Sequence, residues 1–195
     1  MRGICYTITI EELDGRILNG SYMKQAYLEC GKIINTHGFR GTVKLESWCD
    51  TPDVLAGLKT LWFAENGEYR PCRVKHASLF KQFVLADLEG VETEDAANVL
   101  RNRVVFAARE DLPLEKGDHF VVDLIGLPVL DADSGECLGE MIDVKQYGAR
   151  DLYVVQTASG EYMIPAVPEF VPRIEEDAVY VRPIPGLLDG GAENV

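Results

Sequence analysis

The most informative segment of this 195-residue chain runs Lys32-Ile33-Ile34-Asn35-Thr36-His37-Gly38-Phe39-Arg40-Gly41-Thr42-Val43-Lys44. After its second glycine, Val43 and Leu45 alternate with polar residues, which is the period of a strand with one buried face. Gly38 and Gly41 permit positive φ angles and a close approach of the backbone. We therefore predict a strand that follows a glycine-containing loop.

The side chains of that loop suit a nucleic acid. His37 and Arg40 can contact phosphate, Phe39 can stack on a base, and Lys44 adds a cation in the strand that follows. We predict that His37, Arg40 and Lys44 face RNA. The alternative is an ordinary connection between strands whose polar side chains are only solvated, and the residue types leave both open.

The rest of the N-terminal half predicts an antiparallel sheet with one helix. Asn66-Gly67 lies between two strand-like runs and indicates a two-residue hairpin turn. Further strands are expected at Phe83 to Leu88 and at Arg103 to Ala107. Between them, Thr93 can cap a short helix, whose apolar stripe we expect at Ala96, Val99 and Leu100. This helix would close one end of a small barrel.

The charged, proline-containing segment 109–117 predicts a linker to a second domain. Beyond it, short strands separated by turns predict a second small barrel or sandwich, so the whole fold is expected to be all-β. We expect strands at Leu127 to Leu130, Cys137 to Val144, Leu152 to Gln156, Tyr162 to Ile164 and Val179 to Val181. We expect residues 189–195 to form a disordered tail.

The formal net charge of −13 is distributed unevenly. Residues 1–22 carry 2 basic and 3 acidic side chains, residues 23–117 carry 13 and 14, and residues 118–195 carry 4 and 15. Binding of a polyanion depends on Lys and Arg, so the near-neutral half could face RNA and the acidic half a basic protein. An acidic surface that serves only solubility is the alternative.

The sequence contains no recognisable motif of an enzyme or a metal site. Gly15 to Gly20 lacks the lysine of a phosphate-binding loop, and dinucleotide, nucleophile-elbow and zinc-helix motifs are absent. Asp131 to Gly135 resembles a calcium loop only faintly, because Glu136 replaces the required glycine, and a tight turn is expected there. The five cysteines form no C-x-x-C pair. No apolar run approaches the roughly 18 residues that cross a bilayer. We expect a reduced, cytoplasmic monomer without metal, cofactor or membrane partner.

Several segments, taken in order, resemble the RimM family of ribosome maturation factors. They are His37-Gly38-Phe39-Arg40-Gly41, Asp95-Ala96-Ala97 with Leu100-Arg101, Leu112-Pro113, Asp123-Leu124-Ile125-Gly126-Leu127-Pro128-Val129, Gly135-Glu136-Cys137-Leu138-Gly139 and Pro185-Gly186-Leu187-Leu188. The resemblance covers about residues 24–188. Its specificity comes from the order and spacing of the segments more than from any one of them.

The resemblance implies a translation-factor-like β-barrel with one short helix over residues 23–108 and a PRC-type barrel over residues 118–188. It also implies a non-catalytic factor that binds the head of the immature small ribosomal subunit and assists 16S rRNA folding and processing. In such a protein the second barrel contacts the basic nineteenth small-subunit protein. Family members commonly carry two aromatic residues before the Asp-Leu-Ile-Gly stretch, and here these positions are His119-Phe120. This pair either contacts the subunit or braces the linker against the second barrel.

We accordingly predict a protein-binding side made of His119, Phe120 and Asp123, with Asp131, Asp133 and Glu136 steering a basic partner. A flavin-binding or other small-molecule enzyme is a competing hypothesis, because similar barrels occur in flavin-binding reductases. A PRC-barrel scaffold without a ribosomal role is another. Residues 1–22 lie outside the resemblance, so we expect Met23 to be the natural start.

Overall fold

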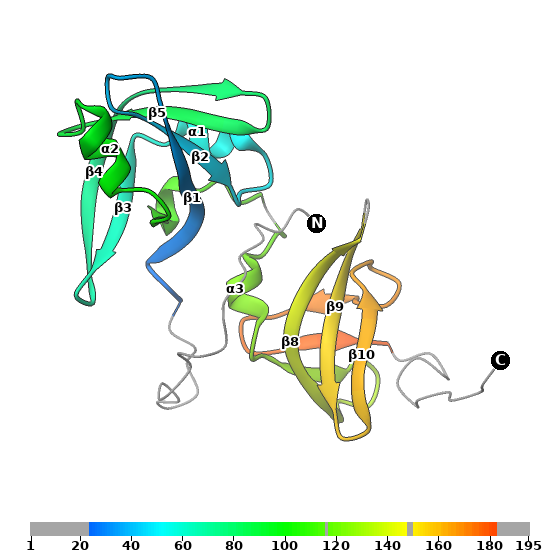
Figure 1. Cartoon of the computed structure of the whole chain (residues 1–195). Coiled ribbons are helices and arrows are strands. Elements are labelled where there is room, and N and C mark those ends of the chain that lie inside the picture. Colours follow the sequence, from blue (N-terminus) through cyan, green and yellow to red (C-terminus); the bar gives the residue numbers. More distant parts are fainter. Residues whose placement is uncertain (1–23, 116, 148–149, 183–195) are drawn as a thin grey trace. The chain divides into compact units, whose positions relative to one another are not determined.

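The structure is a computed structural model that describes residues 24–115, 117–147 and 150–182 (Figure 1). These residues form two compact units, Lys24–Asp118 and a second unit from His119 onward. The expected extension 1–22, the expected start at Met23 and the expected tail 189–195 lie outside the described residues.

The first unit is a closed barrel of six strands in the order β1-β2-β5-β4-β3-β6. The strands are β1 (Tyr27–His37), β2 (Thr42–Ser47), β3 (Thr60–Glu65), β4 (Glu68–Phe80), β5 (Phe83–Leu88) and β6 (Val104–Ala108). All of their pairings are antiparallel. β1 and β4 contain register shifts, which bend a strand and allow it to pair with a different neighbour along its length.

Alternating side chains fill the interior of this barrel. Val43 and Leu45 of β2 are fully buried, as are Val84, Ala86 and Leu88 of β5. Successive side chains of a strand point to opposite faces, so this spacing places every second residue inside. The strands expected at Thr42 and at Phe83 to Leu88 are thereby confirmed. Asn66 and Gly67 have φ angles of 53° and 81°, which confirms the hairpin turn between β3 and β4.

Two short helices accompany the barrel, not the single one expected. The predicted helix α2 (Glu94–Val99) begins as expected, because the Thr93 hydroxyl accepts a hydrogen bond from the Ala96 N–H at 3.2 Å. The predicted apolar stripe is wrong. Val99 is 78% exposed, and Ala97 is the fully buried residue. Residues two positions apart lie on nearly opposite sides of a helix, so α2 packs on β1 and β2 through Ala97 and turns Val99 to solvent.

The helix missing from the sequence analysis is α1 (Pro52–Gly57), which packs against β4 and β5 and buries Leu55. Thr51 followed by Pro52 is a common helix start, because proline at the first helical position loses no hydrogen bond. After β6, Arg109–Asp111 form a single 3₁₀ turn, and the Arg109 N–H donates to the Ala26 carbonyl at 2.9 Å. The first residues of the segment expected to be a linker are therefore bonded to the first unit.

The second unit contains a six-stranded sheet in the order β10-β9-β8-β7-β12-β11, preceded by the short helix α3 (Val121–Leu124). Its strands are β7 (Pro128–Asp131), β8 (Cys137–Tyr147), β9 (Arg150–Thr157), β10 (Gly160–Pro165), β11 (Arg173–Ile174) and β12 (Val179–Val181). β12 and β7 run parallel, and the other pairs are antiparallel. The five strands expected here are present, whereas β11 and α3 were not predicted.

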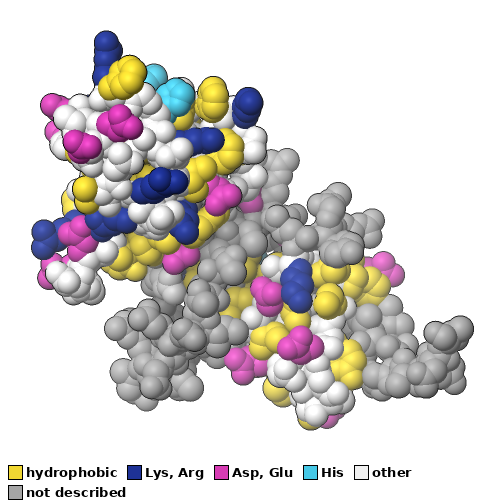
Figure 2. Space-filling view, in the orientation of Figure 1, with side chains coloured by type: hydrophobic (Ala, Val, Ile, Leu, Met, Phe, Trp, Pro, Cys, Tyr) yellow, Lys and Arg dark blue, Asp and Glu magenta, His cyan; other side chains and the backbone are white. Residues whose placement is uncertain are grey.

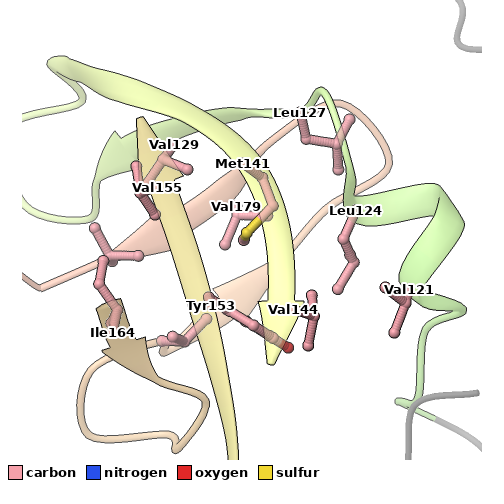
Figure 3. Packing of buried hydrophobic residues seen from close by; sticks show 12 residues of the cluster. Val121, Leu124, Leu127, Val129, Met141, Val144, Tyr153, Val155, Ile164 and Val179 are labelled. Atoms are coloured by element: carbon pink, nitrogen blue, oxygen red, sulfur yellow. The ribbon is translucent and has the colours of Figure 1, made fainter. Parts of the chain in front are cut away.

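One face of this sheet surrounds the core of the second unit. Figure 3 shows Met141 of β8, Tyr153 of β9 and Val179 of β12 turned toward the same interior, with Leu124 of α3 beside them. Burial raises the pKa of the Tyr153 hydroxyl, with the Asp151 charge adding to the effect. The two sheets confirm the expected all-β fold. No helix among the described residues is long and apolar enough to cross a membrane.

Candidate RNA and protein interfaces

The loop between β1 and β2 takes the conformation that its glycines suggested. Gly38 and Gly41 have φ angles of 72° and 83°. Phe39 between them is 87% exposed, and Arg40 is also exposed. His37 ends β1 at the surface, and Lys44 lies half-buried on the outer face of β2. All three predicted RNA-facing residues are therefore accessible.

The structure joins this loop to the hairpin between β4 and β5. The His37 ring lies 5.6 Å from the Phe80 ring, and Lys44 Nζ lies 3.7 Å from the centre of the Phe83 ring. Phe80 and Phe83 are cross-strand partners, which places their side chains on one face. Lys81 at the hairpin tip holds its Nζ 5.9 Å from the centre of the Phe80 ring. We call His37, Lys44, Phe80, Lys81 and Phe83 the hairpin surface.

Sequence reasoning missed Phe80, Lys81 and Phe83, although the break at Lys81-Gln82 between two strands was a visible signal of a hairpin. A hairpin places residues that flank its turn side by side. What the sequence could not show is that this hairpin lies next to His37 and Lys44, because that contact depends on the pairing of β2 with β5.

In the part of the chain that the structure describes, Arg40 of the loop and the two lysines of the hairpin surface lack the acidic partner that some other cations of the barrel have. Elsewhere Lys75 Nζ lies 3.0 Å from Glu92, and Arg103 lies 2.9 Å from Glu65. Within the described ranges, Arg40, Lys44 and Lys81 form no ion pair. In Figure 2 many Lys and Arg side chains cover the visible face of the first unit, whereas Asp and Glu predominate on that of the second. The three cations are thus available to an anionic partner.

The predicted protein-binding residues separate into two groups at opposite ends of β7. His119, Phe120 and Asp123 lie at or just before α3, which precedes β7. Asp131 is the last residue of β7, and Asp133 and Glu136 belong to the turn that follows it. Phe120 is only 2% exposed. A buried ring fits the alternative in which this residue braces the start of the second unit.

The turn after β7 is held by the carboxylate of Asp131. Its Oδ1 accepts hydrogen bonds from the backbone N–H groups of Asp133 and Ser134, both at 2.8 Å. This is the tight turn expected from the sequence. Asp133 and Glu136 are exposed, and Asp133 lies 3.9 Å from Arg182. Asp131 thus shapes the turn, while Asp133 and Glu136 are the carboxylates that a partner can reach.

The Asp131 turn is expected to weaken in acid. Hydrogen bonds from Ser134 and then Asp133 lower the Asp131 pKa below its ordinary value of 3.8. A lowered folded-state pKa gives stability that is complete above the unfolded-state value and is lost as the pH falls through the lowered value. Urea midpoints followed by circular dichroism between about pH 5 and pH 2.5 should therefore fall further for the wild type than for Asp131→Asn, whose amide oxygen accepts the same bonds without titrating. Parallel pH curves for the two proteins would contradict this account.

The outer face of the second sheet carries further carboxylates that sequence reasoning missed. Gln156 of β9 pairs with Glu140 of β8 on one side and with Glu161 of β10 on the other. All three side chains are exposed. In the described ranges no cation forms an ion pair with either carboxylate. We call Glu140, Gln156 and Glu161 the acidic row. A long-range pairing pattern creates it, so spacing along the chain gave no signal.

The described residues contain no group of three or more His, Cys, Asp or Glu side chains that could hold a metal ion. Two thiols of the first barrel are also poor nucleophiles. Burial raises the pKa of Cys30 well above its ordinary value and that of Cys49 to about 11. Since the thiolate is the reactive form, both remain in the inactive thiol state at neutral pH.

Comparison with known proteins agrees with the two units. A family model described as the RimM N-terminal domain matches residues 28–112, and one described as the RimM PRC barrel domain matches residues 121–185. The ribosome maturation factor RimM of Clostridioides difficile is 33% identical over 172 residues, which are 85% of this chain and 98% of the relative. That of Ruminiclostridium cellulolyticum is 35% identical over 167 residues, 84% of this chain and 98% of the relative. The solution structure of the N-terminal domain of RimM from Thermus thermophilus matches with a TM-score of 0.38 and 20% identity, over 46% of this chain and 98% of that chain.

These matches define a two-domain protein that joins a RimM N-terminal domain to a PRC barrel. The chain belongs to the RimM family of ribosome maturation factors. The resemblance drawn from the sequence is thereby confirmed. Ribosome maturation is not a catalytic role, and both matching models describe RimM domains, so the flavin-enzyme hypothesis gains no support from them.

Proposed function

We propose that this protein binds the head of the immature small ribosomal subunit and assists folding and processing of 16S rRNA without a catalytic step of its own. Contacts that favour native rRNA geometry would shift a folding equilibrium toward that geometry. The observation that carries the proposal is the electrostatic difference between the units of a RimM-family chain. The first presents unpaired cations beside exposed rings, and the second presents unpaired carboxylates.

The N-terminal RimM domain, which we assign to residues 23–108, is the proposed RNA side. His37, Arg40 and Lys44 are accessible at one end of the β1–β2 hairpin and beside it. Cations that form no ion pair within the protein can contact phosphate without first losing an internal partner. The first barrel is therefore suited to rRNA despite the overall acidity of the chain.

The PRC-type domain, which we assign to residues 118–188 after a linker at 109–117, is the proposed protein side. Its partner is the small, basic nineteenth protein of the subunit head. The acidic row, together with Asp133 and Glu136, supplies carboxylates that attract a cationic surface. His119 and Asp123 add polar groups near α3, and Phe120 supports them from within. The protein acts as a cytoplasmic monomer in this scheme.

Charge reversal on the acidic row tests the protein partner. The full-length double variant Glu140→Lys with Glu161→Lys should bind the purified nineteenth protein about tenfold or more weakly, measured by fluorescence anisotropy over a salt series. Wild-type binding should weaken as salt rises, since the attraction is screened. The matched control is Glu68→Lys with Glu89→Lys, which changes the net charge equally on exposed positions of the first unit.

The control variant should bind like the wild type. Equal losses in the two double variants would show that only net charge matters and would reject the acidic row as the interface. A wild-type protein that does not bind the nineteenth protein at all would reject the partner assignment.

A further inference from the structure

We propose that the hairpin surface, together with Phe39, is a stacking platform for unpaired nucleotides, so that the first barrel holds looped or single-stranded rRNA and not a duplex. This inference rests on the proposed function and names the form of RNA that its first unit takes. It also assigns a recognition role to Phe39 and Phe80.

The rings of Phe39 and Phe80 are exposed to solvent, which does not stabilise the fold. Phe39 is 87% exposed and Phe80 is 40% exposed. Phe80 contacts the His37 ring, and two residues after His37 the chain reaches Phe39. Leu79 is also exposed, but as the neighbour of Phe80 in β4 it points to the other face of the strand and is not part of this surface. Exposed rings next to cations are the groups with which proteins bind unpaired bases.

The positions of the lysines indicate which ring is free to stack on a base. Lys44 Nζ lies 3.7 Å from the centre of the Phe83 ring and so covers it, whereas Lys81 Nζ lies 5.9 Å from the Phe80 ring. We therefore assign base stacking to Phe80 and Phe39, and phosphate contact to Lys44, Lys81 and Arg40. Two carboxylates lie near this surface: Glu46 is the cross-strand partner of Phe83, and Asp87 accepts a hydrogen bond from Thr42, the cross-strand partner of His37.

The shape of these groups discriminates between forms of RNA. In an A-form duplex the faces of the bases are stacked on one another, and a protein meets only phosphates, riboses and groove edges. An exposed ring therefore finds no base face in a duplex. Unpaired nucleotides offer such faces, and stacking on aromatic side chains contributes to their binding without regard to sequence.

The test uses the full-length protein and a uridine RNA of about 12 nucleotides that carries one central 2-aminopurine. Stacking on a ring quenches the fluorescence of this base, whereas contact with phosphate alone does not. Phe80→Leu and Phe39→Leu should each weaken binding about fivefold to a hundredfold, the range that single base–aromatic contacts support, and should each reduce the quenching, which the double variant should abolish. Phe80→Tyr should retain both.

Two controls separate stacking from other effects. Tyr69→Leu removes a ring of the same barrel that is 39% exposed, as exposed as Phe80, but stacked on Tyr27 with ring centres 4.4 Å apart. It should leave RNA binding unchanged. Lys44→Gln and Lys81→Gln should each reduce the slope of log affinity against log salt by about 0.7 while keeping the quenching. Lys75 already forms an ion pair with Glu92, so Lys75→Gln should change the slope little.

The outcomes also separate this inference from the proposed function. Co-sedimentation of each variant with immature small subunits is measured in parallel. If the subunit binds wild type and Phe80→Leu alike, and a duplex of equal length binds as tightly as the single strand, the stacking platform is rejected while the proposed function stands. If Phe80→Leu no longer binds a ribosomal protein but binds the RNA like the wild type, the surface is a protein interface and the inference fails. If the wild type does not bind the subunit, the proposed function itself is rejected.

Discussion

Gly139→Ala is expected to destabilise the second unit while leaving the first unit intact. Gly139 lies in β8, where a Cβ atom would overlap the carbonyl oxygen of Gln156, and would lie 2.9 Å from the Gln156 carbonyl carbon and 3.1 Å from Val155 Cγ1. Two of these atoms belong to the backbone of β9, so the added methyl can fit only if the two strands separate. Overpacking costs about 1–3 kcal/mol and occasionally more, and a clash with backbone atoms belongs at the upper end of that range.

The position of the tryptophans allows the unfolding of the first unit to be followed separately from that of the second. Both tryptophans of the chain, Trp48 and Trp62, lie in the first unit. For Gly139→Ala, the urea curve from Trp fluorescence should therefore match that of the wild type. The circular dichroism signal of the second sheet should be lost at a lower urea concentration than in the wild type. Gly57→Ala is the control, because its added Cβ meets nothing within 4 Å and it needs no positive φ. A parallel loss in both signals for Gly139→Ala would contradict the independence of the units.

Gly41→Ala is expected to destabilise the first unit by about 2–4 kcal/mol, because two costs add at one residue. Its φ of +83° is left-handed, which costs an ordinary residue about 1–2 kcal/mol. Its Cβ would also lie 2.5 Å from the Val91 carbonyl oxygen and 2.8 Å from the Val91 carbonyl carbon. Val91 cannot retreat easily, since its N–H donates to the Leu88 carbonyl at the end of β5.

Gly38→Ala separates the two costs. Gly38 has a φ of +72°, but a Cβ there meets nothing within 4 Å. The free energy of unfolding of Gly38→Ala should fall only by the cost of the left-handed φ, about 1–2 kcal/mol. Urea unfolding followed by Trp fluorescence measures both variants. Equal losses would mean that the contact between Gly41 and Val91 contributes nothing, contrary to the structure.

Features fixed by a few neighbouring residues were predictable from the sequence. The Asn66-Gly67 turn was found because few residues tolerate two successive positive φ angles. The start of α2 was found because a threonine side chain can bond the free N–H groups of a first helical turn. The buried face of α2 was not found, because a helix of six residues contains too few apolar side chains to define a stripe.

Features that depend on distant pairing were not predictable. The loop proposed to face RNA was identified from its own residues, but Phe80 and Phe83 reach it only through the sheet order β1-β2-β5-β4. The acidic row exists because Glu140 and Glu161 flank Gln156 from two different strands. β11 has two residues and α3 has four, which is too short for any period to emerge. His37, Arg40 and Lys44 are accessible, and their contact with RNA stays a prediction, whereas Phe120 of the proposed protein side is buried.

In each unit the first strand pairs with the last described strand, although only the first sheet is a closed barrel. β1 pairs with β6, and β7 pairs with β12. On a translating ribosome, neither sheet can therefore be completed until its whole segment has left the exit tunnel. Once β6 has left the tunnel, the nascent chain can hold a finished first barrel. While β12 is still inside the tunnel, the chain exposes an edge of β7 whose backbone groups lack their partner, and such an edge can pair with another chain. The interval in which this protein is most exposed to misassembly is thus the synthesis of its second half.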